Sequence, residues 1–387
     1  MKRSIFSADH EEFRGTVKTF VQREIAPRQE ECRSERRIPR EVWLGAGEQG
    51  FLGLPVPARY GGGEADDYRF HVVLAEELAG AALAFASSVG IHTDVVAPYL
   101  IELTSEEQRE RWLPRFCSGD TVTAIAMTEP GAGSDLAALR TRAVRDGSSG
   151  WRLTGSKIFV TNGYHADLVL VAARTGDGRR DISLFAVESG AEGFTRGRKL
   201  DKVGQPESDT AELFFEDVPL TDGNLVGPLH GGFRAMMDRL PQERLNSAVI
   251  NVAHAAAALE ATLAYAAGRT AFGAPIGSFQ YNRFLLAELV TKVDVARAFV
   301  DRCVEAHLQG SLSGVDAAKA KWWSAQTQNE VIDACVQMHG GYGYMREYEV
   351  ARAWLDARVT RIWAGSNEIM KEIIGRDLGF GAPAKHR

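Results

Sequence analysis

The pattern of apolar and polar positions divides the chain into a helical start, a strand-rich middle and a helical end. Up to about residue 118, apolar positions recur at the spacing of amphipathic helices. The segment TSEEQ, which begins at Thr104, reads as a helix start of the Ser/Thr-x-x-Glu type. The clearest predicted helices cover residues 11–25, 39–50, 68–79 and 109–116. We expect an N-terminal helical domain over residues 1–119.

After about residue 120 the pattern changes to short apolar runs. These runs are rich in Val, Ile, Phe and Thr, and turns of Gly, Asp and Ser separate them, as is typical of strands. The predicted strands are residues 121–127, 151–161, 167–174, 181–187 and 211–215. Since no GxGxxG follows a strand, a nicotinamide-binding βαβ domain has no support. The pattern predicts an antiparallel β domain over residues 120–225.

The last third of the chain returns to helical spacing. Two long stripes advance in alternating steps of about four and three residues, which favours helices packed in a bundle. The stripes are Leu245, Val249, Val252, Ala256, Leu259, Leu263 and Ala266, then Leu286, Leu289, Val293, Ala296, Val300 and Cys303. With two further helices at residues 315–338 and 363–375, we expect a C-terminal four-helix bundle over residues 226–387. The predicted fold class is α+β, and we interpret both stripes as core packing.

Composition and charge narrow the classes of partner. The 387 residues are 45% hydrophobic and 25% charged, with a net charge of −6, which gives no reason to expect nucleic acid. The four cysteines form no CxxC pair, so neither a disulfide framework nor a metal site is predicted. The start of the chain turns acidic before any apolar run develops, and no apolar run approaches the roughly 18 residues of a membrane span. We therefore expect a cytoplasmic, soluble protein.

The most informative chemistry follows the first predicted strand. The residues from Ala126 to Asp135 read AMTEPGAGSD, so a β-prone run ends abruptly in a polar step, a proline and two glycines. Such a loop lets a bare backbone approach a planar heterocycle or a phosphate closely. The ten-residue string resembles the flavin-binding signature of the acyl-CoA dehydrogenase family, whose helical–β–helical order also matches the whole chain.

This resemblance implies an FAD cofactor and names its contacts. Thr128 and the backbone around Met127 would contact the flavin, and Ser134 would contact the CoA portion of the substrate. A second motif, KIFVTNG from Lys157 to Gly163, places Phe159 against the ring and the hydroxyl of Thr161 near N5. Donors near N5, N1 and O2 favour a flavin that accepts hydride. Taken singly, each threonine is equally well an ordinary strand residue.

Other segments resemble the family's contacts across a subunit interface. RTAFG, from Arg269 to Gly273, resembles the element whose arginine meets the FAD pyrophosphate of a neighbouring subunit, as a planar guanidinium suits phosphate. Phe272 belongs to this element. The glycine-rich segment with Gln337, Gly340 and Gly341 resembles the part that approaches the same cofactor from the partner. Ser366 and Glu368 match contacts on the adenosine side. The resemblance thus implies a homo-oligomer, with a dimer of dimers as the usual state, and a structural role for His339.

The residue expected to act as the base departs from the commonest family pattern. Many members carry a glutamate where this chain has Ala364, in the segment WAGS. Long-chain and isovaleryl types instead carry it at the position of Glu243, in LPQERL. Since Pro241 precedes Glu243, we expect the carboxylate near a helix start, where it could also simply complement the helix N-terminus.

The resemblance therefore implies that Glu243 takes the α-proton of an acyl thioester while hydride passes from Cβ to flavin N5, giving a trans-2-enoyl thioester. Arg244 would tune the site, and Ala364 with Gly365 would hold the thioester through the backbone N–H of Ala364. The expected enzyme is an FAD-dependent acyl-CoA dehydrogenase that passes electrons to an electron-transfer flavoprotein. Alternatives are a flavin monooxygenase or oxidase on the same fold, a non-catalytic CoA-binding subunit, and a dehydrogenase of acyl-carrier-protein thioesters. The chain length and branching of the acyl group stay open.

Overall fold

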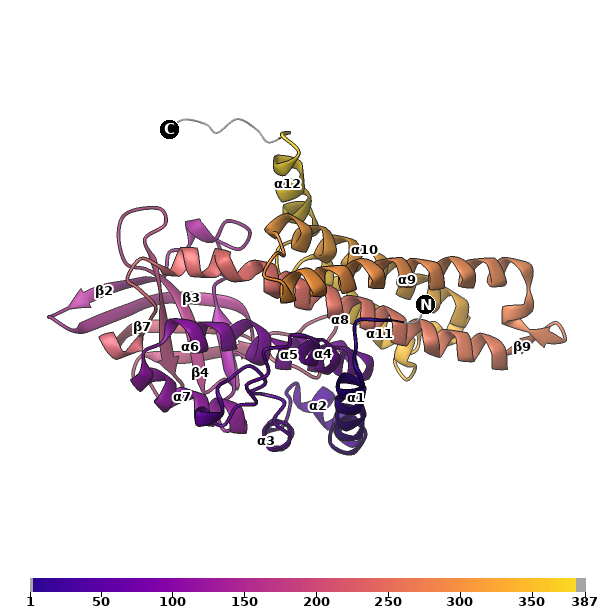
Figure 1. Ribbon diagram of the computed structural model, residues 1–387, viewed down its shortest axis with the longest axis horizontal. Coiled ribbons are helices and arrows are strands. Elements are labelled where there is room, and N and C mark those ends of the chain that lie inside the picture. Colours follow the sequence, from indigo (N-terminus) through magenta and orange to yellow (C-terminus); the bar gives the residue numbers. More distant parts are fainter. Residues whose placement is uncertain (1–2, 381–387) are drawn as a thin grey trace.

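The structure, a computed structural model, describes residues 3–380; the first two and last seven residues of the predicted end domains lie outside the described residues. Helices form the first part of the chain, up to Ser118 (Figure 1). Their bounds are α1 Ala8–Phe20, η1 Val21–Ile25, η2 Ala26–Arg28, α2 Gln29–Glu35, α3 Arg40–Glu48, η3 Ala58–Tyr60, α4 Arg69–Ala81, α5 Leu83–Gly90, η4 Ile91–Val96, α6 Ala97–Leu103 and α7 Glu106–Ser118. The predicted start of α7 is shifted by one residue, because Ser105 and Gln108 form the capping box.

Strands form the middle of the chain. They are β1 Thr123–Ala126, β2 Arg142–Asp146, β3 Gly150–Thr161, β4 Leu168–Arg174, β5 Ile182–Glu188, β6 Phe194–Lys199, β7 Thr210–Thr221 and β8 Leu225–Val226, with short helical turns at η5 Leu136–Ala138 and η6 Asp222–Asn224. The sheet order is β6-β7-β3-β2-β4-β5-β8. The sheet is mainly antiparallel, as predicted. The prediction missed two parallel contacts, because β1 pairs with β4 in parallel and β2 meets β4 in parallel. β2 and β6 were also missed, since their charged residues break the apolar pattern.

Helices return from α8 onward and form an elongated bundle that extends beyond the sheet (Figure 1). The elements are α8 Gly232–Gly268, β9 Thr270–Ala271, β10 Ala274–Pro275, η7 Ile276–Ser278, α9 Gln280–Leu308, α10 Gly314–His339, η8 Gly340–Tyr344, α11 Glu349–Ala357, η9 Arg358–Arg361 and α12 Asn367–Asp377. The fourth bundle helix was assigned wrongly: α11 lies against both α8 and α10, whereas α12 packs on α10 and projects from the bundle. The helical–β–helical order itself is confirmed, and the exact domain bounds stay a prediction.

Both predicted apolar stripes lie largely in the bundle core. Leu245, Val249, Val252 and Leu259 of α8 pack with Leu289, Val293, Val300 and Cys303 of α9. Leu263 is an exception, at 39% exposed. Against the expectation of no spanning segment, α8 is long and apolar enough to cross a membrane, but 61% of its apolar window is buried inside the protein, as in a core helix. The four cysteines are free and buried.

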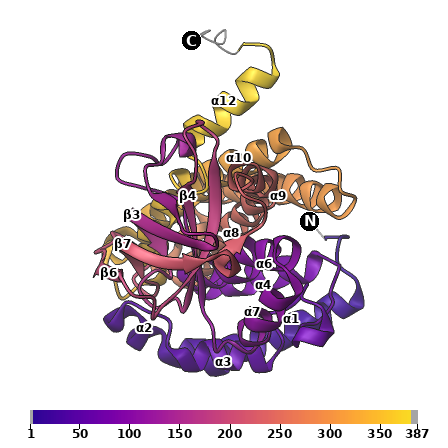
Figure 2. The same cartoon turned by 90° about the vertical axis from the view of Figure 1, so that its left-hand side faces the viewer.

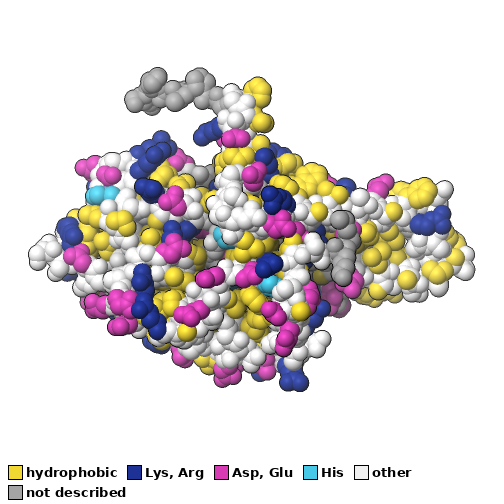
Figure 3. Space-filling view, in the orientation of Figure 1, with side chains coloured by type: hydrophobic (Ala, Val, Ile, Leu, Met, Phe, Trp, Pro, Cys, Tyr) yellow, Lys and Arg dark blue, Asp and Glu magenta, His cyan; other side chains and the backbone are white. Residues whose placement is uncertain are grey.

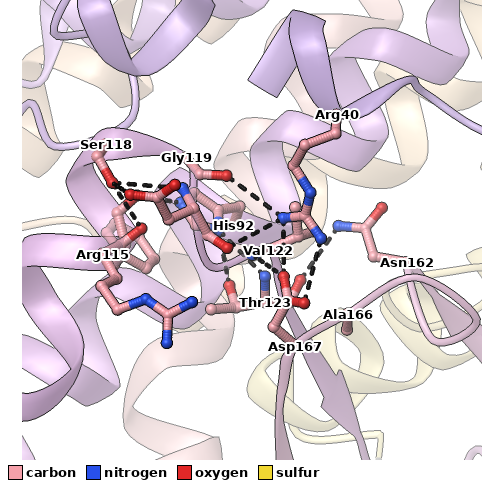
Figure 4. Close-up of polar contacts among 12 residues, drawn as sticks. Arg40, His92, Arg115, Ser118, Gly119, Val122, Thr123, Asn162, Ala166 and Asp167 are labelled. Carbon is pink, nitrogen blue, oxygen red and sulfur yellow. Dashed lines mark hydrogen bonds and ion pairs between the residues drawn. The ribbon is translucent and has the colours of Figure 1, made fainter. Parts of the chain in front are cut away.

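The N-terminal helices α4 and α5 pack directly on α8, and the sheet lies at one end of the molecule beside both (Figures 1 and 2). A polar network joins the N-terminal helices to the sheet (Figure 4). Arg40 binds Asp167 through two N–O contacts of 2.8 and 3.1 Å, and Asp167 accepts the backbone N–H of Val122 at 2.8 Å. Asn162 donates its side-chain amide to the carbonyls of Ser88 and Thr123. Because these contacts fix the start of β1 and the end of β3, they align the two strands that carry the predicted flavin motifs.

Candidate active site

The two predicted flavin motifs lie side by side. The N–H of Ile158 donates to the carbonyl of Thr128 at 2.9 Å, and the Lys157 ammonium donates to the carbonyl of Met127 at 3.2 Å. The register of β3 against β7 shifts between Lys157 and Val160, which marks a β-bulge. Within it, Phe159 takes a φ of 59° and is 65% exposed. The bulge thus turns an aromatic ring out of the sheet beside the Thr128 loop, as a ring-packing role requires.

A buried ion pair clamps these motifs together. Lys157 Nζ lies 2.8 Å from Glu129 Oε1, and both side chains are buried. The same carboxylate accepts the backbone N–H groups of Arg140 and Thr141. Burial lowers the pKa of Lys157 to about 8 against the pull of Glu129. Burial alone would raise the pKa of Glu129, yet Lys157 and the N–H donors hold it below its usual value.

Glu243 lies in the interior of α8 and not near a helix start. The helix begins at Gly232, and Pro241 sits within it. The sequence prediction was wrong because a proline more often marks a first turn than an interior position. This placement also removes the alternative that Glu243 complements a helix N-terminus. Since Pro241 has no N–H, it leaves the carbonyl four residues before it without its helical donor.

The surroundings of Glu243 favour its neutral form. Burial is the largest cause, the charge of Asp94 adds to it, and together they raise the pKa of Glu243 to about 7. Arg244, Arg239 and a long 3.4 Å hydrogen bond from the Tyr99 hydroxyl act in the opposite direction. A carboxylate with a pKa near 7 is poised to take and release a proton at neutral pH.

Asp94 is itself buried, in η4. Its side chain and its carbonyl both accept from the amide of Gln242, at 3.0 and 3.1 Å. Burial raises the pKa of Asp94 well above its usual range. A pair of buried carboxyls, one of them on the helix of the predicted base, is therefore built into this part of the fold.

The predicted thioester-binding residues form a strained turn between η9 and α12. Ala364 has a φ of 50° and Gly365 a φ of 85°, so two consecutive residues are left-handed. Ser366 then caps α12 by accepting the N–H of Ile369. The Lys321 ammonium donates to the carbonyl of Gly365 at 2.6 Å. Strain held in this way is frequent at ligand-binding sites.

Several buried polar atoms near this turn lack hydrogen-bond partners within residues 3–380. They include Arg244 Nε, Trp363 Nε1 and Asn367 Nδ2. Buried donors of this kind are normally satisfied by a ligand or by water. Together with the exposed ring of Phe159, they fit a large ligand that has both polar groups and an aromatic face, as FAD has.

The remaining predicted contacts form a second group at the far end of the bundle. Phe272 and Gly273 both have positive φ at the tip of the β9–β10 hairpin, as a type I′ turn requires, and Phe272 is 99% exposed. The guanidinium of Arg269 lies over the ring of Tyr342. Gln337, Gly340 and Gly341 are exposed beside it. His339 is buried, stacks on Tyr265 and bonds the carbonyl of Cys335, which is the structural role expected of it.

The other predicted residues belong to the flavin motifs and to the start of α12. Ser134 is exposed in the loop after β1, Thr161 is half-buried at the end of β3, and Glu368 is exposed in the first turn of α12. The sequence interpretation missed Asp94, Lys157 with Glu129, and Lys321. The signal for Asp94 is a single charge in an otherwise apolar or small-residue stretch, which is rare unless the charge is paired. Lys321 stands two residues after the partly exposed Lys319, so the sequence shows no such signal for it.

Comparison with known proteins identifies the family of the chain. Family models of the acyl-CoA dehydrogenase N-terminal, middle and C-terminal domains match residues 7–120, 124–218 and 230–379. A mitochondrial long-chain specific acyl-CoA dehydrogenase of Sus scrofa is 45% identical, with 97% of this chain and 88% of the relative covered.

Solved structures agree as well. The crystal structure of an acyl-CoA dehydrogenase from Geobacillus kaustophilus matches with a TM-score of 0.94 and 43% identity, covering 96% of this chain and 98% of that one. An acyl-CoA dehydrogenase from Bacillus anthracis, solved with FAD, matches with a TM-score of 0.91 and 28% identity, covering 98% of this chain and 69% of that one. The chain belongs to the acyl-CoA dehydrogenase family of FAD-dependent oxidoreductases.

Proposed function

We propose that the chain desaturates an acyl-CoA thioester between Cα and Cβ, with Glu243 as the base that removes the α-proton. The observation that carries this proposal is the burial of Glu243, whose carboxyl has a pKa raised to about 7. FAD, when bound, supplies the acceptor for the hydride that leaves Cβ. A thioester α-C–H is only weakly acidic, so the carboxylate alone is not enough, and the thioester oxygen must be stabilised as negative charge develops on it.

The turn at Ala364 and the neighbouring Arg244 supply that stabilisation in our proposal. The backbone N–H of Ala364 donates to the thioester oxygen, and Gly365 allows the backbone to approach it closely. The buried guanidinium of Arg244 lowers the pKa of Glu243, which keeps part of the base ionised at neutral pH. Ser134, exposed near the end of the first flavin motif, is suited to contact the CoA portion.

The test is anaerobic mixing of the purified holoprotein with a panel of acyl-CoA and acyl-carrier-protein thioesters. We expect the yellow flavin absorbance to bleach with acyl-CoA, with the rate depending on chain length and branching. Faster bleaching with acyl-carrier-protein thioesters would change the carrier assigned here. Rapid release of H₂O₂ in air without anaerobic bleaching would contradict the dehydrogenase and favour an oxidase.

The charge of Asp94 provides a prediction about pH. Because Glu243 must be ionised to accept a proton, kcat/KM should rise with pH through about 7 and then level off. Asp94→Asn removes a negative charge that raises the pKa of Glu243, so this rise should move to lower pH, by on the order of one unit. Asp238→Asn, an exposed carboxylate earlier on α8, is the control and should leave the profile unchanged. A profile that Asp94→Asn does not move would contradict the coupling.

We further propose that two chains build each FAD site in a homodimer, with a dimer of dimers as the full assembly. Glu243 and Arg269 are 26 residues apart along α8, which at 1.5 Å per residue is about 39 Å. One cofactor beside Glu243 therefore needs Arg269 and Phe272 from a second chain. Exposed apolar side chains on the projecting end of the bundle support such an assembly (Figure 3). They include Phe272, Tyr281, Phe284 and Val295.

We propose an electron-transfer flavoprotein as the electron acceptor. A solved structure whose title names the electron-transferring flavoprotein of Acidaminococcus fermentans contains a chain with a TM-score of 0.92 and 33% identity to this one, covering 98% of this chain and 99% of that one. That likeness supports the proposal, together with the family to which the chain belongs.

A further inference from the structure

Lys321 of α10 is a fully buried cation that the reaction outlined above does not use. Its side chain has no exposed surface, and buried alanines lie nearby on the same helix, namely Ala317, Ala318, Ala320 and Ala325. Burying an ammonium group costs free energy unless strong contacts compensate for it. Its hydrogen-bond partners are two neutral oxygens: the carbonyl of Gly365 at 2.6 Å and the side chain of Asn367 at 3.5 Å. The buried charge of Lys321 thus contacts the turn that contains Gly365 and, through Asn367, the start of α12.

That turn is the segment proposed to bind the thioester. Its two left-handed residues, Ala364 and Gly365, make it a conformation that needs external support. Two contacts at the start of α12 support the turn: Ser366 caps the helix, and Lys321 donates to the carbonyl of Gly365, the residue before the cap. On the other side, the methyl of Met370 would lie 2.6 Å from any Cβ at Gly365, so the turn is closely packed there. The Lys321 bond therefore fixes the direction of the Gly365 carbonyl and, with it, the course of the turn.

The helix around Lys321 is in turn anchored to α8. The Lys321 carbonyl accepts the hydroxyl of Ser324, which accepts the amide of Asn251 at 3.2 Å. Burial and the charge of Arg244 lower the pKa of Lys321 to about 7, while Glu368 acts in the opposite direction. Arg244 and Lys321 thus bring two cations to one buried region, next to the place where the reaction develops negative charge.

We propose that Lys321 is a positioning residue: its ammonium holds the Gly365 carbonyl so that the Ala364 N–H is aimed at the thioester oxygen. This inference rests on the role proposed above for Ala364. It predicts that loss of Lys321 impairs polarisation of the thioester more than binding of the thioester.

The test compares Lys321→Met, which keeps length without charge or donor, with Lys321→Gln, which keeps an amide donor. Lys319→Met is the matched control, since Lys319 lies on the same helix in an exposed pair with Asp316. The probe is a 3-thia-acyl-CoA with a ¹³C-labelled carbonyl, whose sulfur at the β position prevents hydride release. Its dissociation constant, its α-hydrogen exchange in D₂O and its carbonyl infrared band are measured on each holoprotein, alongside flavin bleaching by the best acyl-CoA.

For Lys321→Met we expect bleaching and α-hydrogen exchange to slow by about 100-fold, as when an oxyanion donor is misplaced. The dissociation constant should change less than about threefold, and the carbonyl band should lose much of the shift to lower frequency that wild type induces. Lys321→Gln should fall between the two, and Lys319→Met should match wild type.

A Lys321→Met protein that bleaches within threefold of wild type and keeps the carbonyl shift overturns the inference. If Lys321→Met does not retain FAD, Lys321→Gln decides by the same criteria. Glu243→Gln separates this inference from the proposed function, because it should lose α-hydrogen exchange while keeping the carbonyl shift. A wild-type protein without exchange or shift overturns the proposed roles of Glu243 and Ala364 themselves, and this inference with them.

Discussion

Glu243→Gln is expected to slow flavin bleaching by acyl-CoA at least about 100-fold, because the amide cannot accept the α-proton. Glutamine keeps the size of the side chain and an oxygen for the long hydrogen bond from Tyr99. The binding of FAD and of the thioester should therefore change little. Anaerobic stopped-flow absorbance measures the rate. Glu260→Gln, an exposed glutamate on the same helix, is the control and should bleach as wild type does.

The stability of the Glu243→Gln protein offers an independent check. In the folded protein the pKa of Glu243 is raised to about 7, so the fold binds a proton that the unfolded chain has already released. This carboxyl therefore lowers the free energy of unfolding as pH rises from its ordinary range near 4.5 through about 7. At pH 8 the variant should be at least as resistant to urea as wild type.

Flavin bleaching by Glu243→Gln at the wild-type rate would refute the assignment of the base.

Lys157→Met is expected to lower the free energy of unfolding by about 3–5 kcal/mol, because it leaves the Glu129 carboxylate buried without its cation. The same change should weaken FAD binding, since the pair joins the loop after β1 to the bulge of β3. Urea denaturation and the ratio of flavin to protein after purification measure the two effects.

Two further variants make the Lys157 result specific. Lys292→Met breaks an exposed pair with Glu330 and should cost less than about 1 kcal/mol. In the double variant Lys157→Met, Glu129→Leu no unpaired charge remains, so much of the lost stability should return. If Lys157→Met unfolds within about 1 kcal/mol of wild type, the clamp has no energetic importance.

The helical–β–helical order was predictable because hydrophobic periodicity depends on local sequence. Strand pairing was not predictable. The parallel contact of β1 with β4 joins segments about 45 residues apart, and its backbone hydrogen bonds produce no periodic pattern in the sequence. The interior position of Pro241 was missed for a related reason: tertiary packing holds α8 together where local preference would end it.

The candidate site shows the same division between features that local sequence indicates and features that depend on tertiary contacts. Glu243, Phe159 and Ala364 stand in recognisable strings and were predicted with their chemistry. Asp94 and Lys321 act through neighbours that are distant along the chain, Gln242 and Gly365, so only the folded arrangement gives them meaning. A single sequence does not show which distant residue a buried charge contacts.

The left-handed backbone at Ala364 carries an evolutionary consequence. This position already holds a residue with a Cβ in a strained conformation, so a longer side chain there requires no new backbone geometry. A lineage can thus move its proton-abstracting group between the long helix and this turn by two point substitutions, at residues 243 and 364. The fold thus offers two alternative origins for one chemical group, and in the assignment proposed above this chain uses the helix.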